Sequence, residues 1–401
     1  MDLVYDAEYE AFRTQVQGFL ADAWNPDSTL NKAEKRVAEA KFRQRAIGQG
    51  FLYRAIPRQY GGSEQAPDVM RAQVIREEFT RQRAPMEVAG VGVGMLVPTL
   101  LECGTQWQKD EFIAKTLTGE YQWAQGYSEP NAGSDLASVR TKGVLQDGEW
   151  VINGQKVWST FAQHARFMFA LVRTEPNASK HEGLSYLLLD LKQPGVTVRP
   201  LKQVTGGEEF CEVFFDDART PADWIVGERG KGWSVSKTTL VHERSSFIGN
   251  ASSSQALYEK LKELARSTQL NGRPATEDAQ IRERLLMLEG YVASHVYSSY
   301  RQFSMTAHGQ SSGIVSLMNK LISTQIGHEV AKLGRDLMGD NLLLAPSLQI
   351  ERCLGSEKWN NQFFGSLGVA IAGGASNIQR NIIAERGLGL PRDKGQESTV
   401  Q

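Results

Sequence analysis

The stretch Tyr121–Thr160 constrains the fold of this chain more than any other part of the sequence. Its second half has the pattern of a β-hairpin, with a strand near Ser138–Val144, a turn at Gln146–Gly148 and a return strand at Glu149–Ile152. Asn153-Gly154 follows at once and predicts a second tight turn, because Asn-Gly tolerates the positive φ that both central residues of such a turn need. The sequence therefore predicts a β domain in the middle of the chain.

Residues from about 120 to 227 continue this pattern. Short apolar runs separated by turn residues are expected as strands at Phe167–Arg173, Leu184–Asp190, Val196–Pro200 and Glu212–Asp216. Regularly spaced short strands are typical of a small antiparallel barrel or sandwich. We expect this domain to span residues 120–227.

Both flanks of the β region have helical periodicity. In the first flank, apolar residues recur on one helix face at Phe12, Val16, Phe19 and Leu20. Further helices are expected at Ala33–Ile47, Ala66–Arg83, Val91–Leu101, Ser234–Arg266, Ile281–Thr306, Gly313–Met338 and Gly355–Glu385. The predicted fold class is therefore α+β multidomain, with a helical domain at 1–119 and a helical bundle at 228–401.

The composition narrows the classes of function. A formal net charge of -1 gives no global field for nucleic acid or for an anionic membrane. No run of 18 apolar residues predicts a membrane span, and the acidic N-terminus does not have the pattern of a secretory signal. Cys103, Cys211 and Cys353 are too far apart for a metal motif or a disulfide framework, which favours a reducing cytosol and a cytoplasmic protein.

Two motifs of the central stretch resemble the acyl-CoA dehydrogenase family. Tyr127–Asp135 is similar to the family's flavin-wrapping segment, Tyr-Ser/Thr-Glu-Pro-x-Ala-Gly-Ser-Asp, and Ile152–Trp158 is similar to its Ile-Asn-Gly-x-Lys-x-Trp. The helical–β–helical order also resembles the family, so the resemblance covers nearly the whole chain. It implies two helical domains around a β domain, a C-terminal four-helix bundle and a bound FAD.

The resemblance assigns flavin contacts to residues of these two motifs. An isoalloxazine ring needs backbone and hydroxyl hydrogen bonds along its polar edge and a flat side chain against one face. The residues implied are Tyr127, Ser128, Trp158 and Thr160 at the ring, with Gly133 and Ser134 near the cofactor or its ligand. The alternative is structural, with Trp158 as a core residue and Ser134-Asp135 shaping a turn.

The family removes the α-proton of an acyl-CoA thioester with a carboxylate. Many members place it in a C-terminal Tyr-Glu-Gly-Thr segment, but here Ala372 and Gly373 occupy the tyrosine and glutamate positions. A second subgroup places a glutamate before an arginine on the helix after the β domain, which matches Glu243 and Arg244. Glu243 is the predicted base, and Glu129 is the next carboxylate to consider.

The resemblance implies that Gly373 keeps a function without its side chain. In the family, a backbone N–H at this point donates a hydrogen bond to the thioester oxygen as that oxygen gains negative charge, which is a small oxyanion hole. With Arg244, Ser134 and Ala372, Gly373 would then form the substrate side of the site. Loss of the two larger side chains opens volume, so we expect a long, branched or polycyclic acyl group.

The cofactor's pyrophosphate is harder to place. Family members often carry Arg-x-x-Phe-Gly on the first long C-terminal helix, and this sequence lacks the phenylalanine and the glycine. Guanidinium groups suit phosphate. The open choices are Arg266, Arg273 and Arg282, and the resemblance adds Asp336, Gly339 and Asn377 as further FAD contacts.

The implied activity is FAD-dependent α,β-dehydrogenation of an acyl-CoA to a trans-2-enoyl-CoA. The resemblance also implies an electron-transferring flavoprotein as acceptor and a homodimer or homotetramer, while the departures at the arginine and glutamate motifs also suit a heteromer. Three alternatives stay open. A flavin-dependent monooxygenase or oxidase would not need Glu243, a non-catalytic subunit would bind FAD poorly or not turn over alone, and a helical protein without cofactor would be colourless.

Overall fold

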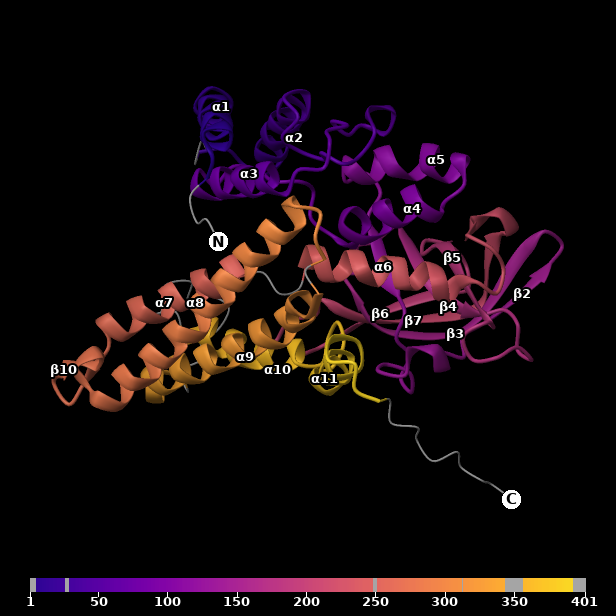
Figure 1. Ribbon diagram of the computed structural model, residues 1–401. Helices are drawn as coiled ribbons and strands as arrows, with labels where there is room; N and C mark the ends of the chain where they lie inside the picture. The colour runs from indigo at the N-terminus through magenta and orange to yellow at the C-terminus, as the bar shows by residue number, and fades with distance from the viewer. Residues whose placement is uncertain (1–4, 26–28, 248–250, 312, 343–355, 392–401) are drawn as a thin grey trace, which may run out of the picture. The chain divides into compact units, whose positions relative to one another are not determined.

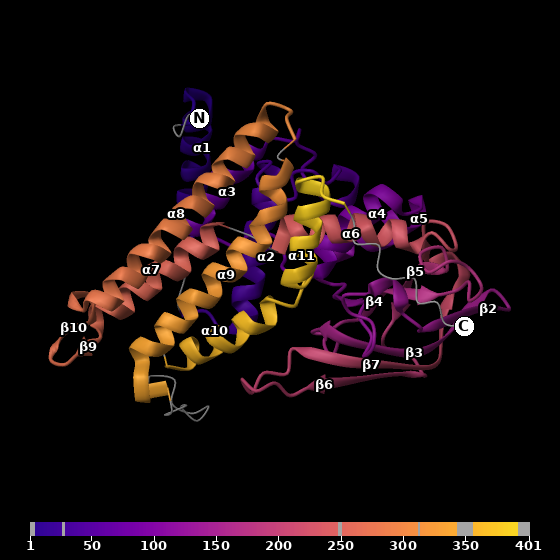
Figure 2. The same ribbon diagram turned by 60° about the horizontal axis from the view of Figure 1, so that its bottom comes forward.

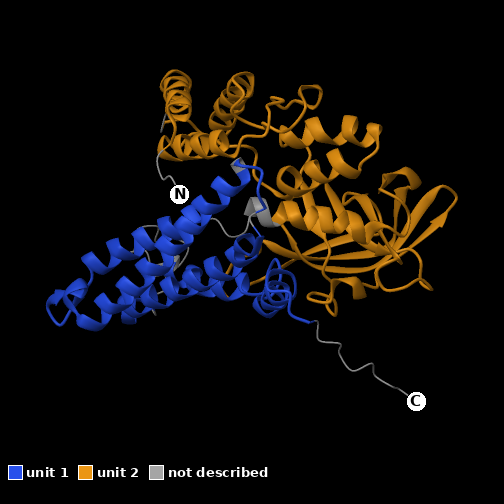
Figure 3. Ribbon diagram, viewed as in Figure 1, with its two compact units in different colours: residues 1, 247–401 blue, residues 2–246 orange. Residues whose placement is uncertain are grey.

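The computed structural model describes residues 5–25, 29–247, 251–311, 313–342 and 356–391. Cys353 lies outside these residues, and so does the side chain of Arg244. The chain forms two compact units, residues 2–246 and residues 247–401 (Figure 3). The predicted domain boundaries at 119 and 227 stay predictions. No helix among the described residues is long and apolar enough to cross a membrane.

The first unit begins with the predicted helices (Figure 1). α1 buries Phe12, Val16 and Leu20 on one face, as the spacing predicts. α2 begins at a capping box, in which the Asn31 side chain accepts from the Glu34 N–H and the Glu34 carboxylate accepts from the Asn31 N–H. The elements are α1 (Ala7–Ala23), α2 (Lys32–Gly48), η1 (Arg58–Tyr60), α3 (Val69–Arg81), the π-helical turn η2 (Gly92–Leu96), α4 (Val97–Cys103) and α5 (Gln106–Leu117).

An eight-stranded sheet follows in the same unit, in the order β6-β7-β3-β2-β4-β5-β8, with β1 paired to β4. Most neighbours are antiparallel, as predicted. The exceptions are β1, which pairs with β4 in parallel, and a single parallel pair between Lys142 of β2 and Arg173 of β4. The strands are β1 (Trp123–Gly126), β2 (Lys142–Gln146), β3 (Glu149–Thr160), β4 (Phe167–Arg173), β5 (Leu184–Asp190), β6 (Val196–Leu201), β7 (Phe210–Pro221) and β8 (Ile225–Val226).

The hairpin prediction was right at one turn and wrong at the other. Asp147 and Gly148 have φ of 52° and 83° and join β2 to β3. Asn153-Gly154 is not a turn, because β3 runs straight through it, and its pairing with β7 shifts register between Ile152 and Gly154. Such a shift is a β-bulge. The predicted first strand was also placed too early, since β2 begins at Lys142.

The helices and the sheet share one core. Phe112 of α5 packs edge-on against three aromatic rings of the β region, Trp123, Phe167 and Trp224. The buried amide of Gln108 donates hydrogen bonds of 2.9 and 2.8 Å to backbone carbonyls of 223 and 225, beside strand β8. These contacts fix the N-terminal helices on one face of the sheet. α6 (Gly232–Phe247) continues the chain, and all but its last residue belong to this unit.

The second unit is a helical bundle. Its long helices pack around a core that includes Tyr258, Leu261, Leu333 and Trp359. Gly334 lets the Trp359 ring approach the helix, because a Cβ there would lie 2.2 Å from Trp359 Cε3. Figure 2 shows α11 beside α9. The helices are α7 (Ala251–Ser267), α8 (Ala279–Ala307), α9 (Gly313–Met338), α10 (Ser356–Val369) and α11 (Ser376–Ile382), with a short ribbon of β9 (Gln269–Leu270) and β10 (Arg273–Pro274) between α7 and α8.

Two of the predicted long helices are divided. The segment predicted at Ser234–Arg266 forms α6 and α7, and the one predicted at Gly355–Glu385 is interrupted between α10 and α11. The second interruption contains Gly373 and Gly374, which have φ of 62° and 99°. These values lie in the left-handed region, which favours glycine and ends a helix. Gly373, which occupies the position of the family's C-terminal glutamate, therefore lies in a turn.

Candidate active site

A buried ion pair holds the motif segment that follows β1. Lys156 of β3 is fully buried, and its Nζ lies 2.9 Å from Glu129 Oε1 and donates to the Tyr127 carbonyl at 3.0 Å. The Glu129 carboxylate also accepts from the backbone N–H groups of Arg140 and Thr141, at 2.7 and 2.8 Å. One lysine and one glutamate thus tie the motif segment to both β3 and the start of β2.

Glu129 is a poor candidate for a base in this setting. Burial on its own raises the pKa of the Glu129 carboxyl, but Lys156 and the backbone donors outweigh it and hold the pKa below its usual value. Burial lowers the pKa of Lys156 to about 8. A carboxylate that is ionised and fully engaged in hydrogen bonds has little tendency to take up a proton.

Trp158 lies in a second irregularity of β3. The pairing with β7 shifts register between Lys156 and Ser159, and Trp158 has a φ of 62°. Positive φ in a bulky residue costs on the order of 1–3 kcal/mol. The backbone turns the indole outward, so that it is 60% exposed with Phe210 edge-on beside it at 6.0 Å. The alternative of a core tryptophan is therefore wrong, and the exposed indole is a flat surface on which an aromatic ring can stack.

In the residue that follows Trp158, the Ser159 hydroxyl is buried and no described group meets hydrogen-bond geometry with it. A buried hydroxyl without a partner costs free energy unless a ligand or water supplies one. Thr160 is half-buried at the end of the same strand. The exposed indole offers a flat surface to a planar heteroaromatic cofactor such as a flavin, and the hydroxyl groups of the two following residues are available for hydrogen bonds.

The other predicted flavin contacts are distributed around this segment. Tyr127 is buried, and its ring packs edge-on against Phe169 and Tyr186, so its side chain belongs to the core. Ser128 is half-buried, and its carbonyl accepts from the Val157 N–H at 2.9 Å. Gly133 and Ser134 are both exposed, in the loop between β1 and β2.

Glu243 lies on α6, on the helix face that points to this segment. Thr239, one helical turn earlier, is fully buried and its Oγ1 donates to the Tyr186 hydroxyl at 3.3 Å. Residues four apart share a helix face. Burial is the main cause that raises the pKa of Tyr127 well above its usual value, and the Glu243 charge adds to it. The half-buried Glu243 therefore lies within electrostatic reach of the Tyr127 hydroxyl.

His242 points elsewhere. Its Nε2 lies 2.7 Å from Glu102 Oε1. This contact joins α6 to α4 and agrees with the prediction that neighbours on a helix do not share a face. Arg244 lies within the helical backbone of α6, and its side chain is outside the described part of the structure.

In the second unit, Gly373 lies in the turn between α10 and α11. No described residue meets hydrogen-bond geometry as an acceptor from the Gly373 N–H. The Gln379 amide lies 3.5 Å from the Gly373 carbonyl, and the Ser376 N–H donates to the Ala370 carbonyl at 3.0 Å. Ala372 is exposed. The turn therefore offers a backbone donor, as the predicted oxyanion role requires.

Two of the three candidate arginines line one cavity. Arg266 of α7 and Arg282 of α8 share it with Lys262, at a volume of about 250 Å³. Three cationic groups around one hollow suit a phosphate. Arg273 is exposed on β10 and does not line this cavity. The remaining members of the lining are Tyr258, Thr276, Leu285, Leu286 and Glu289.

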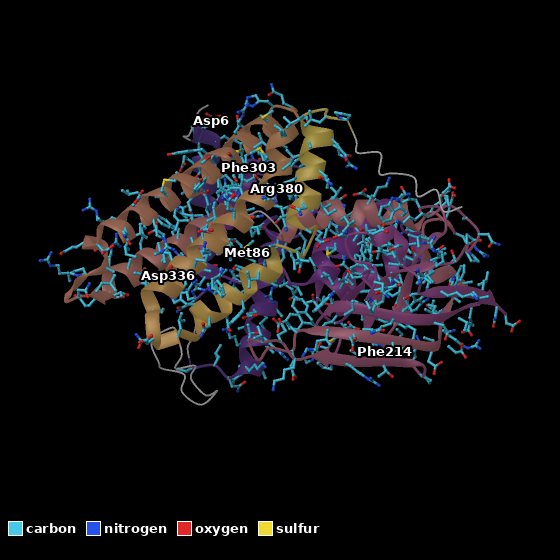
Figure 4. The ribbon with its side chains drawn as sticks, turned by 90° about the horizontal axis from the view of Figure 1, so that it is seen from below. Asp6, Met86, Phe214, Phe303, Asp336 and Arg380 are labelled. Atoms are coloured by element: carbon cyan, nitrogen blue, oxygen red, sulfur yellow. The ribbon has the colours of Figure 1, made fainter. Side chains whose placement is uncertain are left out.

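The other predicted FAD contacts of this unit are solvent-facing. Asp336, labelled in Figure 4, lies near the end of α9 and pairs with Arg284 at 2.8 Å. Gly339 follows that helix with a φ of 50°. Asn377 is exposed on α11 and accepts a hydrogen bond of 3.2 Å from Arg380. Arg380 is also labelled in Figure 4. Their role in cofactor binding stays a prediction.

Sequence reasoning missed the buried partners of these segments. Lys156 stands inside a recognised motif, but its ion pair with Glu129 was not predicted. Tyr186 and Thr239, which lie beside Tyr127, carried no motif. Lys320 of α9 also gave no signal, although it binds the turn that contains Gly373. A lysine within an apolar helical pattern is the only sign that could have been used.

Comparisons with known proteins agree with this architecture. Family models of the acyl-CoA dehydrogenase N-terminal, middle and C-terminal domains match residues 6–120, 124–218 and 230–388. Acyl-CoA dehydrogenase IpdE1 of Mycobacterium tuberculosis is 37% identical over 398 residues, 96% of this chain and 99% of that protein. Two solved structures have TM-scores of 0.77 over 98% of this chain and 100% of theirs: the ChsE4-ChsE5 complex from Mycobacterium tuberculosis at 24% identity and the Tcur3481-Tcur3483 steroid ACAD at 25%.

Proposed function

This chain belongs to the acyl-CoA dehydrogenase family, whose members are FAD-dependent flavoproteins, and from that premise we propose that it dehydrogenates a bulky acyl-CoA with Glu243 as the base. The observation that carries this proposal is the position of Glu243 one turn after Thr239, within electrostatic reach of the Tyr127 hydroxyl. The alternative carboxylate, Glu129, is already committed to Lys156.

The chain's residues fit the cofactor. Trp158 would stack on the flavin, Ser128 and Thr160 would bind its polar edge, and Arg266 and Arg282 are the preferred pyrophosphate ligands because they share a cavity. When bound, FAD accepts the β-hydrogen of the acyl chain as a hydride. These assignments are proposals that rest on the exposed indole, on the cationic cavity and on the Ser159 hydroxyl, for which the described residues supply no partner.

The chain's own part in the reaction is to move one proton and to bind one oxygen. Glu243 takes the α-proton of the thioester, and the Gly373 N–H donates a hydrogen bond to the thioester oxygen while charge builds up on it. The product is a trans-2-enoyl-CoA. Polarisation of the carbonyl lowers the pKa of the α-carbon, which brings it closer to that of a carboxylate.

The proposed acyl group is long, branched or polycyclic. Ala372 and Gly373 stand where larger side chains are common in the family, and the similar Tcur3481-Tcur3483 protein is described as a steroid ACAD. An electron-transferring flavoprotein is the proposed acceptor. Assembly into a homodimer or homotetramer is proposed too, with a heteromer as the alternative, since the similar ChsE4-ChsE5 structure is a complex of two chains.

An anaerobic titration tests this function. The purified protein is expected to be yellow, and one class from a panel between butyryl-CoA and steroid side-chain thioesters is expected to bleach it. Highest kcat/KM for butyryl-CoA would contradict the proposed acyl group. A yellow protein that no thioester bleaches would contradict the dehydrogenase activity and favour an oxygen-using flavoenzyme. A colourless protein would favour a subunit whose FAD site needs a partner chain.

A further inference from the structure

Lys320 is a charged residue in the interior of the second unit for which the reaction gives no direct role. It lies in the first third of α9, is 4% exposed, and donates hydrogen bonds to two backbone carbonyls. One belongs to Val369 at 2.9 Å and the other to Gly374 at 3.0 Å. No carboxylate among the described residues lies within ion-pair distance of its ammonium group.

These two carbonyls flank the turn that presents Gly373. Val369 is the last residue of α10, and Gly374 directly follows Gly373. A single ammonium group therefore spans the turn from one end to the other. We propose, on the premise of the function above, that Lys320 is a positioning residue that holds the Gly373 N–H in place for the thioester oxygen.

The surrounding contacts support a fixed position for the ammonium group. His328, two turns later on α9, meets the Ser366 hydroxyl at 2.9 Å. Ser366 lies in α10, three residues before Val369, so α9 contacts both α10 and the turn that follows it. The Lys320 contacts fix the turn against α9, and the His328 contact fixes the preceding helix α10 against it. The turn also packs closely against α11, because a Cβ on Gly374 would lie 2.3 Å from Gln379 Nε2.

The location also explains why an unpaired ammonium is tolerated. The carbonyls at a helix C-terminus carry partial negative charge, and Val369 ends α10. A buried ammonium without donated hydrogen bonds would be costly. If Lys320 only capped the C-terminus of α10, a hydrogen bond to the Val369 carbonyl would be enough. The second bond, to Gly374, is what connects it with the predicted oxyanion donor.

The test compares Lys320→Met, which removes the ammonium at similar length, with Lys332→Met on the same helix. Lys332 is 40% exposed and pairs with Glu329 at 3.2 Å, so its loss should not change the turn. Both are prepared as holoenzyme and assayed with the acyl-CoA that bleaches the wild type best. We expect Lys320→Met to lose roughly 10- to 100-fold in kcat, with KM changed much less, since a displaced oxyanion donor acts on the transition state.

Two further readouts distinguish positioning from a purely structural role. In the wild type, binding should change the ¹³C chemical shift of a carbonyl-labelled acyl-CoA. This change should be smaller in Lys320→Met. Hydrogen–deuterium exchange should rise in peptides covering 369–378. Lys320→Gln, which keeps N–H donors but removes the charge, should lie between the two and serves in place of Lys320→Met if that variant does not fold.

An active wild type whose Lys320→Met variant keeps its kcat and its carbonyl shift would overturn the positioning role alone, even with a lower Tm. A wild-type protein that oxidises no acyl-CoA would remove the proposed function and the positioning role with it. A parallel loss in Lys332→Met would also count against the proposal, because it would show that the effect is not specific to the turn.

Discussion

Two lysines bind the backbone segments on which the proposed site depends. Lys156 donates to the Tyr127 carbonyl and pairs with Glu129, and Lys320 donates to the carbonyls of Val369 and Gly374. Each is at least 96% buried, by exposures of 0% and 4%. Flexible catalytic loops are less precise than loops held by buried hydrogen bonds. The chain therefore fixes both the cofactor segment and the predicted oxyanion donor from inside.

At the residue scale, Glu243→Gln tests the proposed base. The amide keeps the size of the carboxylate but cannot take a proton at neutral pH. We expect bound flavin to stay and kcat to fall by roughly 10² or more, the usual scale for a positioned base. Flavin absorbance and stopped-flow bleaching measure the two effects. Glu263→Gln, on an exposed position of α7, is the matched control. Turnover near the wild-type rate in Glu243→Gln would place the base elsewhere.

A second residue-scale prediction concerns pH. The folded pKa of Glu129 lies below its ordinary value of 4.5, because Lys156 and backbone donors outweigh burial. Between the two pKa values the unfolded state binds more protons, so the free energy of unfolding falls as pH falls. Glu129→Gln should cost roughly 3–5 kcal/mol at pH 7, since it breaks a buried ion pair.

The difference in the free energy of unfolding between Glu129→Gln and the wild type should then become smaller as pH falls below about 4.5. Chemical unfolding at pH 7 and at pH 4 measures it. An equal difference in the free energy of unfolding at both pH values would show that folding does not lower the pKa of the Glu129 carboxyl. Glu263→Gln is again the control, because replacing this exposed carboxylate should leave the free energy of unfolding unchanged at pH 7 and at pH 4.

The motif residues could be predicted from sequence, but their supports could not. Trp158 was assigned to a ligand because it stood in a recognised motif, and its 60% exposure agrees. Lys320 had no motif, and a lysine on a helix is usually solvated. Its burial depends on the turn of residues 370–375 folding back onto α9, a long-range contact that local sequence does not encode.

At the element scale, strands buried on both faces were the easiest to predict. Phe167–Arg173 and Leu184–Asp190 agree with the structure at both ends, because nearly every residue in them is apolar and buried. Asn153-Gly154 was misassigned because a bulge and a hairpin turn use the same residue types. Pairing with β7, which lies about sixty residues later in the sequence, decides between them.

This bulge gives the element-scale prediction. Gly154 has a φ of 149°, and a Cβ there would lie 2.7 Å from the Thr141 Cα. Gly154→Ala should therefore destabilise the protein by roughly 1–3 kcal/mol, the usual cost of backbone strain. Gly18→Ala is the matched control, because Gly18 lies within α1 with no neighbour within 4 Å of the added Cβ.

Gly18→Ala should raise stability by up to about 1 kcal/mol, since alanine favours a helix. Thermal unfolding should show a lower Tm for Gly154→Ala and an equal or higher Tm for Gly18→Ala than for the wild type. If Gly154→Ala were as stable as wild type, β3 would not be bulged at this position.

At the scale of the whole molecule, the order of helical, β and helical segments was predictable because each has its own periodicity over many residues. The residues proposed for FAD nevertheless come from both compact units. The flavin contacts lie in residues 127–160, and the candidates for the pyrophosphate and adenine parts lie in residues 266–377. One sequence can nominate both sets, but it cannot show how they combine.

Removal of FAD tests whether both sets bind one cofactor. A ligand that binds only the folded state stabilises it by RT ln(1 + [L]/Kd), which is about 2.7 kcal/mol at a hundredfold excess over Kd. We expect apoprotein to regain a higher Tm with added FAD, and Arg266→Ala together with Arg282→Ala to weaken that gain.

FMN is the matched ligand, since it has the flavin ring but lacks the adenine half. If residues 266–377 contribute as proposed, FMN should raise the Tm less than FAD does at equal concentration, and the arginine variants should not alter its effect. Equal shifts from FMN and FAD would mean that only the segment around Trp158 binds the cofactor. No rise in Tm from either ligand would mean that this chain alone does not complete the FAD site. If the site belongs to a heteromer, adding the partner chain would then restore the rise in Tm with FAD.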